Sequence, residues 1–175
     1  MENKVILSKT PRNEDRWRGI KGPTVLSYMV LNLFLSLAID TMHCIYVGIM
    51  KHMLVLSSDK EFKEEPFSIF SKLKLVNGRL RKLSPPHFLQ RLPQSIDKLI
   101  YWKATELRSF MFFSSLIILR DILQPDYYNH FALFVRAVAL LNSSSISRED
   151  LVLSSLLMNQ FVYQFADLYS VRHMT

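Results

Sequence analysis

The sequence is poor in residues that crosslink a chain or turn it sharply. It has one cysteine, Cys44, which excludes an internal disulfide framework and favours a reducing compartment. Four glycines and seven prolines in 175 residues are too few for a turn-rich β-sandwich. Because Cys44 lies inside an apolar run, we expect its thiol to be buried and unreactive.

The motifs that define several large enzyme classes are also missing. The sequence contains no P-loop, no GxGxxG dinucleotide fingerprint and no GxSxG nucleophile elbow. The single cysteine cannot form a cysteine-based zinc site, and His52, His130 and His173 have no partner at metal-ligand spacing. Enzyme classes that depend on these motifs are therefore excluded.

No uncharged run is long enough to cross a bilayer. Residues 24–39, TVLSYMVLNLFLSLAI, are 16 residues without a charge, whereas a membrane-spanning helix needs about 20. Asn32 dilutes this run and Asp40 ends it. The first residues of the chain lack the apolar core of a secretory signal. We therefore expect no membrane partner and an intracellular location, nuclear or cytoplasmic.

What the sequence does contain is an ordinary globular composition. Apolar residues make up 49% and charged residues 21%, which fits a folded chain rather than a disordered one. The length allows one domain with a hydrophobic core, or a piece of a larger domain. Residues 1–22 are a polar N-terminal segment, and we expect residues 23–175 to form a helical but incomplete domain.

Two segments in the first half of the chain have helical periodicity. Asp40 precedes a helix-like pattern, with one face made by Met42, Ile45, Ile49, Met53 and Leu56. Asn77-Gly78 between alternating residues is a hairpin signal, but a longer apolar stripe predicts a helix there, at a cost of about 1 kcal/mol for Gly78. That stripe is Ile69, Leu73, Val76, Leu80 and Leu83.

The second half reads as three further helices. Ser95 is a plausible N-cap for a helix that runs to Leu123, and Pro125 begins the next. Residues 126–141 are apolar nearly all round, so that helix should be buried. Ser147 and Asp150 form a capping box that opens a helix to about Tyr169. The fold class predicted is mostly α, with about six helices and no convincing strand.

Positive charge is concentrated in one part of this basic chain. The net charge is +7, and no Asp or Glu lies between Pro66 and Ser95. Such a basic stripe attracts polyanions, nucleic acid first among them. A solvated helix face explains it equally well. The six basic residues are Lys72, Lys74, Arg79, Arg81, Lys82 and Arg91.

Asp40 and His43 are the first candidate site. On a helix, positions three apart share a face, so a carboxylate and an imidazole could act together on one ligand. The structural alternative is strong, because aspartate is a favoured N-cap that accepts from the amides of the first turn, here Met42 and His43. Local pattern leaves both interpretations open.

Glu106 is the second candidate. In a continuous helix at about 100° per residue, Leu99, Trp102, Phe110, Phe113 and Ile117 would share its face. A carboxylate in such an apolar stripe is costly without a partner. Lys103, Arg120, another basic group or a metal would serve. A structural ion pair and an active-site acid both fit this pattern.

The order of several landmarks resembles the later part of CACTA (En/Spm-type) transposases, over residues 19–175. The landmarks are GIKGPTVLS, DTMHCIYVGIMKHML, RLRKLSPPHFLQRLPQSIDKLIYWKATELRSFM, YYNHFALFVRAVALL and FADLYSVRHMT. The resemblance implies a DDE transposase ancestry, in which an RNase H-like core uses three acids to hold two divalent metals such as Mg²⁺. It also implies that Asp40 and His43 match a C/D-x-x-H motif and that Glu106 is a candidate third acid.

The resemblance implies equally clear departures. The first two catalytic acids of the family lie on strands upstream of the GIKGP landmark, so we expect this chain to be the helical insertion and flanking part without its catalytic sheet. By itself it should not cut DNA and should need no cofactor. Two roles follow as expectations: nonspecific binding of DNA, or an all-α module that binds a protein partner or itself over an exposed apolar face.

Overall fold

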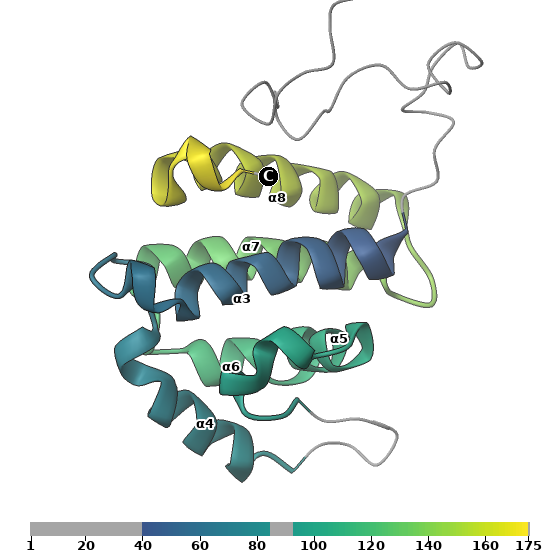
Figure 1. Cartoon of the computed structure of the whole chain (residues 1–175). Coiled ribbons are helices and arrows are strands. Elements are labelled where there is room, and N and C mark those ends of the chain that lie inside the picture. Colours follow the sequence, from purple (N-terminus) through teal and green to yellow (C-terminus); the bar gives the residue numbers. More distant parts are fainter. Residues whose placement is uncertain (1–39, 85–92, 175) are drawn as a thin grey trace, which may run out of the picture.

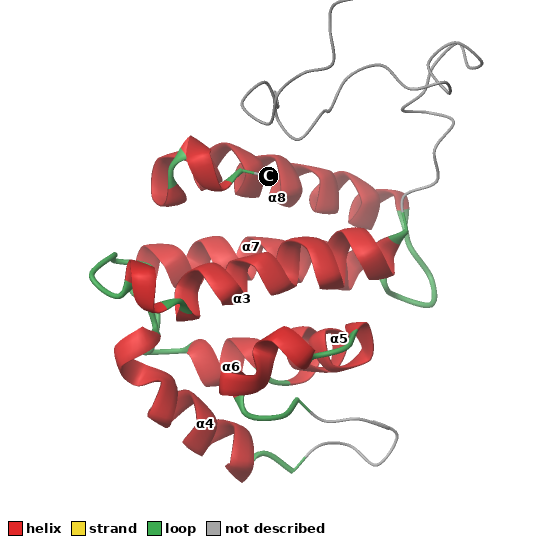
Figure 2. Ribbon diagram, viewed as in Figure 1, coloured by secondary structure: helices red, strands yellow, loops and turns green. Residues whose placement is uncertain are grey.

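The computed structural model describes residues 40–84 and 93–174, and every regular element within them is helical (Figure 2). This confirms the prediction of a mostly α-helical fold. The polar segment 1–22, the apolar run 24–39 and Arg91 lie outside the described residues. The longer helices are η1 (Met42–Met50), α3 (Lys51–Ser58), α4 (Leu73–Lys82), α5 (Ala104–Phe113), α6 (Ser115–Leu119), α7 (Pro125–Leu141) and α8 (Arg148–Tyr169).

These helices are stacked in layers (Figure 1). Helix α8 forms one outer layer and packs on α7. The continuous rod of η1 and α3 lies in the middle layer, in front of α7 in this view, while α5, α6 and α4 form the opposite outer layer. Short 3₁₀ turns connect the parts: η2 (Lys60–Phe62), η3 (Phe70–Lys72), η4 (Ile96–Tyr101) and η5 (Val171–His173).

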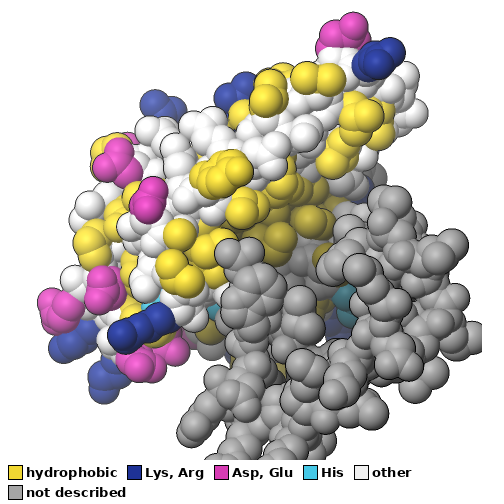
Figure 3. All heavy atoms as spheres, turned by 90° about the horizontal axis from the view of Figure 1, so that it is seen from above, with side chains coloured by type: hydrophobic (Ala, Val, Ile, Leu, Met, Phe, Trp, Pro, Cys, Tyr) yellow, Lys and Arg dark blue, Asp and Glu magenta, His cyan; other side chains and the backbone are white. Residues whose placement is uncertain are grey.

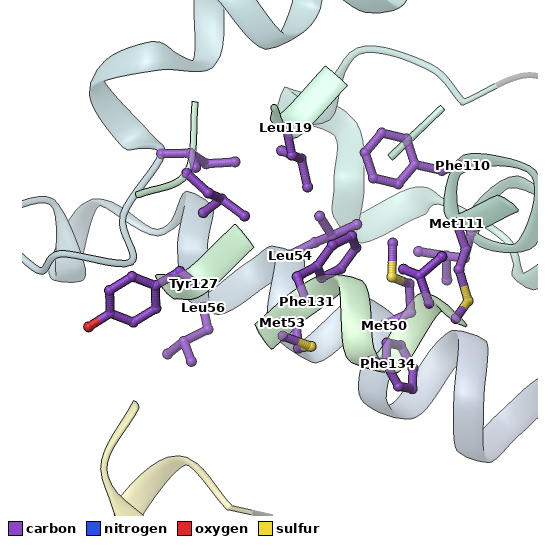
Figure 4. Packing of buried hydrophobic residues seen from close by; sticks show 14 of the residues in the cluster. Met50, Met53, Leu54, Leu56, Phe110, Met111, Leu119, Tyr127, Phe131 and Phe134 are labelled. Carbon is purple, nitrogen blue, oxygen red and sulfur yellow. The ribbon is translucent and has the colours of Figure 1, made fainter. Parts of the chain in front are cut away.

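The core lies where the rod, α5 and α7 meet (Figure 4). Met50 from the end of η1, Phe110 from α5 and Phe134 from α7 have no solvent-exposed surface. Burying a side chain of this size contributes about 1.5–3 kcal/mol. Helix α7 supplies a buried residue at nearly every turn. Asn129, Arg136 and Leu141 are exposed, so the helix predicted at residues 126–141 is buried along one face rather than all round.

Residues 69–83 confirm the choice of helix over hairpin. Ile69 and Val76 are fully buried, and Leu73, Leu80 and Leu83 pack against the same core. Asn77 and Gly78 lie inside α4 rather than in a two-residue turn. The apolar stripe decided the structure because it buries side chains along the whole segment, whereas the turn signal is local.

The prediction of one helix from Ser95 to Leu123 was wrong. Ser95 does accept a hydrogen bond from the Asp97 amide, but the helix it caps is the short 3₁₀ turn η4. Trp102 and Lys103 are extended, and α5 starts afresh at Ala104. Ser114 then interrupts the chain between α5 and α6, with its hydroxyl donating to the Phe110 carbonyl.

These breaks change which side chains face the core. Leu99, Trp102 and Phe110 are buried as predicted, but Phe113 and Ile117 are exposed. The predicted face assumed one uninterrupted helix. The break at Ser114 rotates Ile117 away from that face, whereas Phe113 is the last residue of α5, at the edge of the packed region.

The first helix also differs from its predicted pattern. Residues Met42–Met50 are wound as a π-helix, with more residues per turn than an α-helix. Tyr46 and Met50 are therefore the buried positions, while Met42 is exposed. Cys44 is exposed as well, so the expectation of a buried thiol was wrong.

Two predicted helix starts are confirmed. Pro125 is the first residue of α7. At the start of α8 the Asp150 amide donates to the Ser147 hydroxyl at 3.0 Å, and the Ser147 amide donates back to the Asp150 carboxylate at 3.0 Å. This capping box satisfies two amides that the helix itself leaves unpaired.

Candidate functional site

Asp40 and His43 contact each other at the exposed start of η1. One carboxylate oxygen of Asp40 accepts from the Met42 amide at 2.8 Å, and the other forms a short contact with His43 Nδ1. The hydrogen bond from His43, followed by that from Met42, lowers the pKa of Asp40. The carboxylate therefore caps the first turn and also orients the imidazole.

Glu106 is buried, with 5% of its surface exposed. Its carboxylate accepts from the Lys103 amide at 2.9 Å and so caps the start of α5. Within the described residues no salt bridge reaches Glu106, so the predicted charged partner is replaced by a backbone amide. Such an amide can stabilise a buried carboxylate, because a hydrogen bond to the ionised form offsets part of the desolvation cost.

The candidate acids do not assemble into a metal site. Across residues 40–84 and 93–174, no group of three His, Cys, Asp or Glu side chains is placed to hold a metal ion. Asp40, His43 and Glu106 all lie in these ranges, so the structure does not bring them together in such a group. What this arrangement provides is one surface carboxylate–imidazole pair and one separate buried helix cap.

The basic stripe divides into two sets. Arg79 Nη1 donates to the carbonyls of Ile118, at 2.7 Å, and Arg120, and Lys72 Nζ donates to the Ile122 carbonyl at 2.6 Å. These carbonyls lie at and beyond the C-terminus of α6, where the helix leaves acceptors unpaired and the dipole favours cations. Two of the six basic residues thus stabilise a helix end.

The other described members of the stripe face solvent. Lys74, Arg81 and Lys82 are exposed. Lys74 and Arg81 are seven residues apart, so they lie on one side of α4, roughly opposite the buried Val76. With Arg91 outside the described residues, three cations remain for an outside ligand.

His130 lies inside the α7–α8 interface, which the sequence did not indicate. Its Nε2 donates to the Phe161 carbonyl at 2.9 Å, and its ring stacks on Phe161 with centroids 4.5 Å apart. Burial lowers the pKa of His130, and the bond to Phe161 opposes that shift only in part. The Nδ1 atom has no hydrogen-bond partner within the described residues, so it contributes nothing that would stabilise a protonated ring.

A groove of about 460 Å³ lies where the segment after α3 meets the end of α8. Aromatic side chains line one part of it and two carboxylates, Glu65 and Asp167, another. Phe67 and Tyr169 in its wall are buried and belong to the core. The groove therefore exposes polar and apolar edges of an already packed cluster in similar measure.

Within the described residues, the outward side of α8 is another exposed apolar feature. Val152, Leu156, Asn159 and Tyr163 are four, three and four residues apart and form an outer stripe along this helix. Val152 is 55%, Leu156 61% and Tyr163 79% exposed. Figure 3 looks onto this side and shows apolar side chains spread along it. Leu151, Leu153 and Val162 are exposed beside the stripe.

Sequence reasoning could have found this stripe. The inward residues of α8, such as Leu157, Phe161 and Phe165, form one helical face, and the outer stripe repeats the same spacing on the other. A helix with two apolar faces is expected to be covered on both. In the described part of the chain, no helix is long and apolar enough to cross a membrane.

Comparison of the chain with protein-family models, with curated proteins and with solved structures finds no match. The resemblance to CACTA transposases therefore depends on the sequence landmarks alone.

Proposed function

We propose that the helical region is a non-catalytic binding domain that contacts a protein partner through the outer stripe of α8. The observation that carries this proposal is the exposure of Val152, Leu156 and Tyr163 on a helix whose opposite face is already packed on α7. Isolated exposed apolar residues are common, but a continuous row at helical spacing is typical of an interaction surface.

The proposed ancestry remains that of CACTA-type transposases, with these helices derived from the insertion and flanking part of the parent. The local roles of the acids support a binding rather than a cleaving function. Asp40 and Glu106 each accept a backbone amide at a helix start. A divalent metal such as Mg²⁺ belongs to the intact parent, where it stabilises the attacking and leaving oxygens.

A photo-crosslinking amino acid at position 156 tests the proposal in cells. The same amino acid at Glu61, an exposed position outside α8, is the matched control. We expect a discrete crosslinked band at position 156 that is absent at position 61 and disappears when Val152 and Tyr163 are both changed to serine. Equal crosslinking at both positions would contradict the proposal.

A second candidate function is nonspecific nucleic-acid binding by α4. It is supported by the exposure of Lys74, Arg81 and Lys82 on a helix that carries no acidic residue. Three phosphate contacts predict that log affinity falls with log salt at a slope of about −2.7 for duplex DNA.

Because some basic residues of the stripe stabilise the fold and others face solvent, substitutions can test nucleic-acid binding separately from stability. Arg81→Gln should reduce the salt slope by about 1 without unfolding the chain. Arg79→Gln should instead weaken the fold, because Arg79 caps α6. Affinity for random-sequence DNA that does not change with salt would reject the function.

A further inference from the structure

We propose that the groove between the segment after α3 and the end of α8 binds the guanidinium group of an arginine from a basic partner peptide. The site goes beyond the proposed function, because no residue of the outer stripe lines the groove. The groove has a volume of about 460 Å³, which lies within the range of small-ligand pockets, about 300–1,000 Å³. Every residue that lines it belongs to the described part of the chain.

The groove carries two carboxylates that have no cationic partner within the described residues. Glu65 comes from the segment after α3 and Asp167 from α8, so each wall supplies one of them. Both are exposed, and neither forms a salt bridge in the part of the chain that the structure describes. Lys63 pairs with Glu64 at 3.5 Å, and Arg172 is exposed but does not line the groove. A cation from outside would therefore complement the charge of both walls.

Aromatic rings form the apolar part of the groove. Phe62 and His173 meet edge to face, with 5.1 Å between ring centroids and 84° between ring planes. Both are half-buried, so each keeps part of its surface accessible. The buried Phe67 contacts both rings, with centroids 5.9 Å from Phe62 and 6.4 Å from His173. Aromatic surface beside carboxylates favours guanidinium over ammonium, because guanidinium is planar and weakly hydrated, stacks on rings and donates two parallel hydrogen bonds to a carboxylate.

Backbone contacts hold both walls in place. In the segment after α3, the Glu65 amide donates to the Phe62 carbonyl at 3.0 Å, and the Ser68 amide donates to the Glu65 carbonyl at 2.9 Å. On the other wall, His52 Nε2 donates to the His173 carbonyl at 2.9 Å and so fixes η5 to the rod. A groove whose walls are already ordered loses little conformational entropy when a ligand binds.

Nuclear magnetic resonance titration of the purified full chain with a short glycine–serine peptide that carries one arginine tests the proposal. We expect amide shifts confined to residues 62–68 and 166–173, and a dissociation constant on the order of 1 mM for a single side chain. The same peptide with citrulline, which has nearly the shape of arginine but no charge, should not bind. A lysine peptide should bind roughly 3-fold more weakly than the arginine peptide.

Charge variants with matched controls test the two walls. Glu65→Gln and Asp167→Asn should each weaken binding of the arginine peptide roughly 10-fold, because each removes a charged acceptor. Glu61→Gln and Glu149→Gln remove the same charge from the same two segments outside the groove, and should change the affinity by less than about 2-fold. All four positions are exposed, so none of these changes should unfold the chain.

Three outcomes would overturn the proposal: an arginine peptide that leaves the groove amides unmoved, a citrulline or lysine peptide that binds as tightly, or control variants that weaken binding as much as Glu65→Gln. The last outcome would mean diffuse attraction to an acidic surface rather than a site. Crosslinking at position 156 is independent of these results, so the proposed function stands or fails on its own evidence.

Discussion

Glu106 shows how one side chain can carry the pattern of an active-site acid and perform a structural task. Its carboxylate is buried among apolar residues, yet its oxygen faces the amide of Lys103 at 2.9 Å. At the third position of a helix this reverse bond satisfies a donor that the helix leaves unpaired. Before a metal ligand is inferred from a glutamate among apolar residues, a capping role at a nearby helix start must therefore be excluded.

The capping role of Glu106 predicts an unequal response to two substitutions. Glu106→Gln keeps an acceptor for the Lys103 amide and should cost little, whereas Glu106→Ala should reduce the free energy of unfolding by about 1–2 kcal/mol. Urea denaturation followed by circular dichroism measures both. If Glu106→Gln were as unstable as Glu106→Ala, the negative charge itself would be needed and the capping account would be wrong.

His130 predicts a pH dependence with a defined sign. Its folded-state pKa lies below the ordinary value of 6.5 because the ring is buried, so below that pH the unfolded chain takes up a proton that the folded chain does not. Stability is therefore full above pH 7 and falls as the pH drops, by at most about 1.4 kcal/mol per pH unit. Urea midpoints measured between pH 7.5 and 5.5 should show this loss.

The variant His130→Gln separates this effect from other titrations. It removes the ionisable ring, so its stability should fall less than that of the wild type over the same interval. Above pH 7.5 the two curves should run parallel, since His130 is neutral in both states there. The carboxylates with lowered pKa values, Asp40 and Asp150, act only below about pH 4. Identical slopes in the two proteins between pH 7.5 and 5.5 would contradict the assignment.

At the scale of the helix, a hydrogen bond from a basic side chain of α4 to a backbone carbonyl of α6 holds the two helices together. Arg79 reaches across from α4 to the Ile118 carbonyl at the end of α6. Arg79→Leu should therefore cost about 1–2 kcal/mol, because it leaves partly buried acceptors without a donor. Arg81→Leu, two positions along and exposed, should change stability by less than about 0.5 kcal/mol. Thermal unfolding of the two variants side by side checks this difference.

The glycines of two helices predict opposite effects of the same substitution. A Cβ added at Gly78 in α4 would meet no atom within 4 Å, so Gly78→Ala should stabilise the chain by about 0.5–1 kcal/mol. A Cβ added at Gly48 in η1 would lie 2.9 Å from the His43 carbonyl oxygen, because π winding brings that oxygen close. Gly48→Ala should therefore destabilise. Denaturant midpoints that shift in the same direction for both variants would reject this account.

The sequence predicted elements well where a long apolar stripe or a local cap was decisive. The 69–83 stripe outweighed Asn77-Gly78, and Ser147 with Asp150 marked the start of α8. The sequence-based prediction failed where a helix is interrupted by the non-helical backbone of a single residue, as at Lys103 and Ser114. One such residue between two helical segments hardly changes the spacing of apolar residues, so periodicity cannot detect it.

The candidate site was less predictable than the helices. That Lys72 and Arg79 cap α6 could not be read from the sequence, because their acceptors lie 50 and 39 residues away along the chain. The burial of His130 likewise depends on α8 folding back over α7. By contrast, the cap at Asp40 involves residues at most three apart and was predictable. Features made by residues close together in the sequence could be predicted from it, whereas features made by residues far apart in the sequence could not.

For the whole molecule, the layered arrangement makes α8 the element most dependent on a partner. It packs on α7 along one face and presents the outer stripe on the other (Figure 1). A protein partner that covers this stripe binds the folded chain and not the unfolded one, so it should add stability by mass action. The thermal midpoint of the wild type should therefore rise when the protein captured by crosslinking at position 156 is added.

This dependence gives a final prediction that requires no spectroscopic probe of the interface. Each tenfold increase in the concentration of that protein above its dissociation constant should stabilise the wild type by about 1.4 kcal/mol, whereas Leu156→Glu should melt at one temperature throughout. Calorimetry over a hundredfold range of partner concentration measures the wild type and the variant. Amide exchange in α8 should slow as the partner is added to the wild type alone, because binding suppresses local opening of this outer layer. A midpoint that is constant in the wild type would mean that α8 is stable on α7 without a partner.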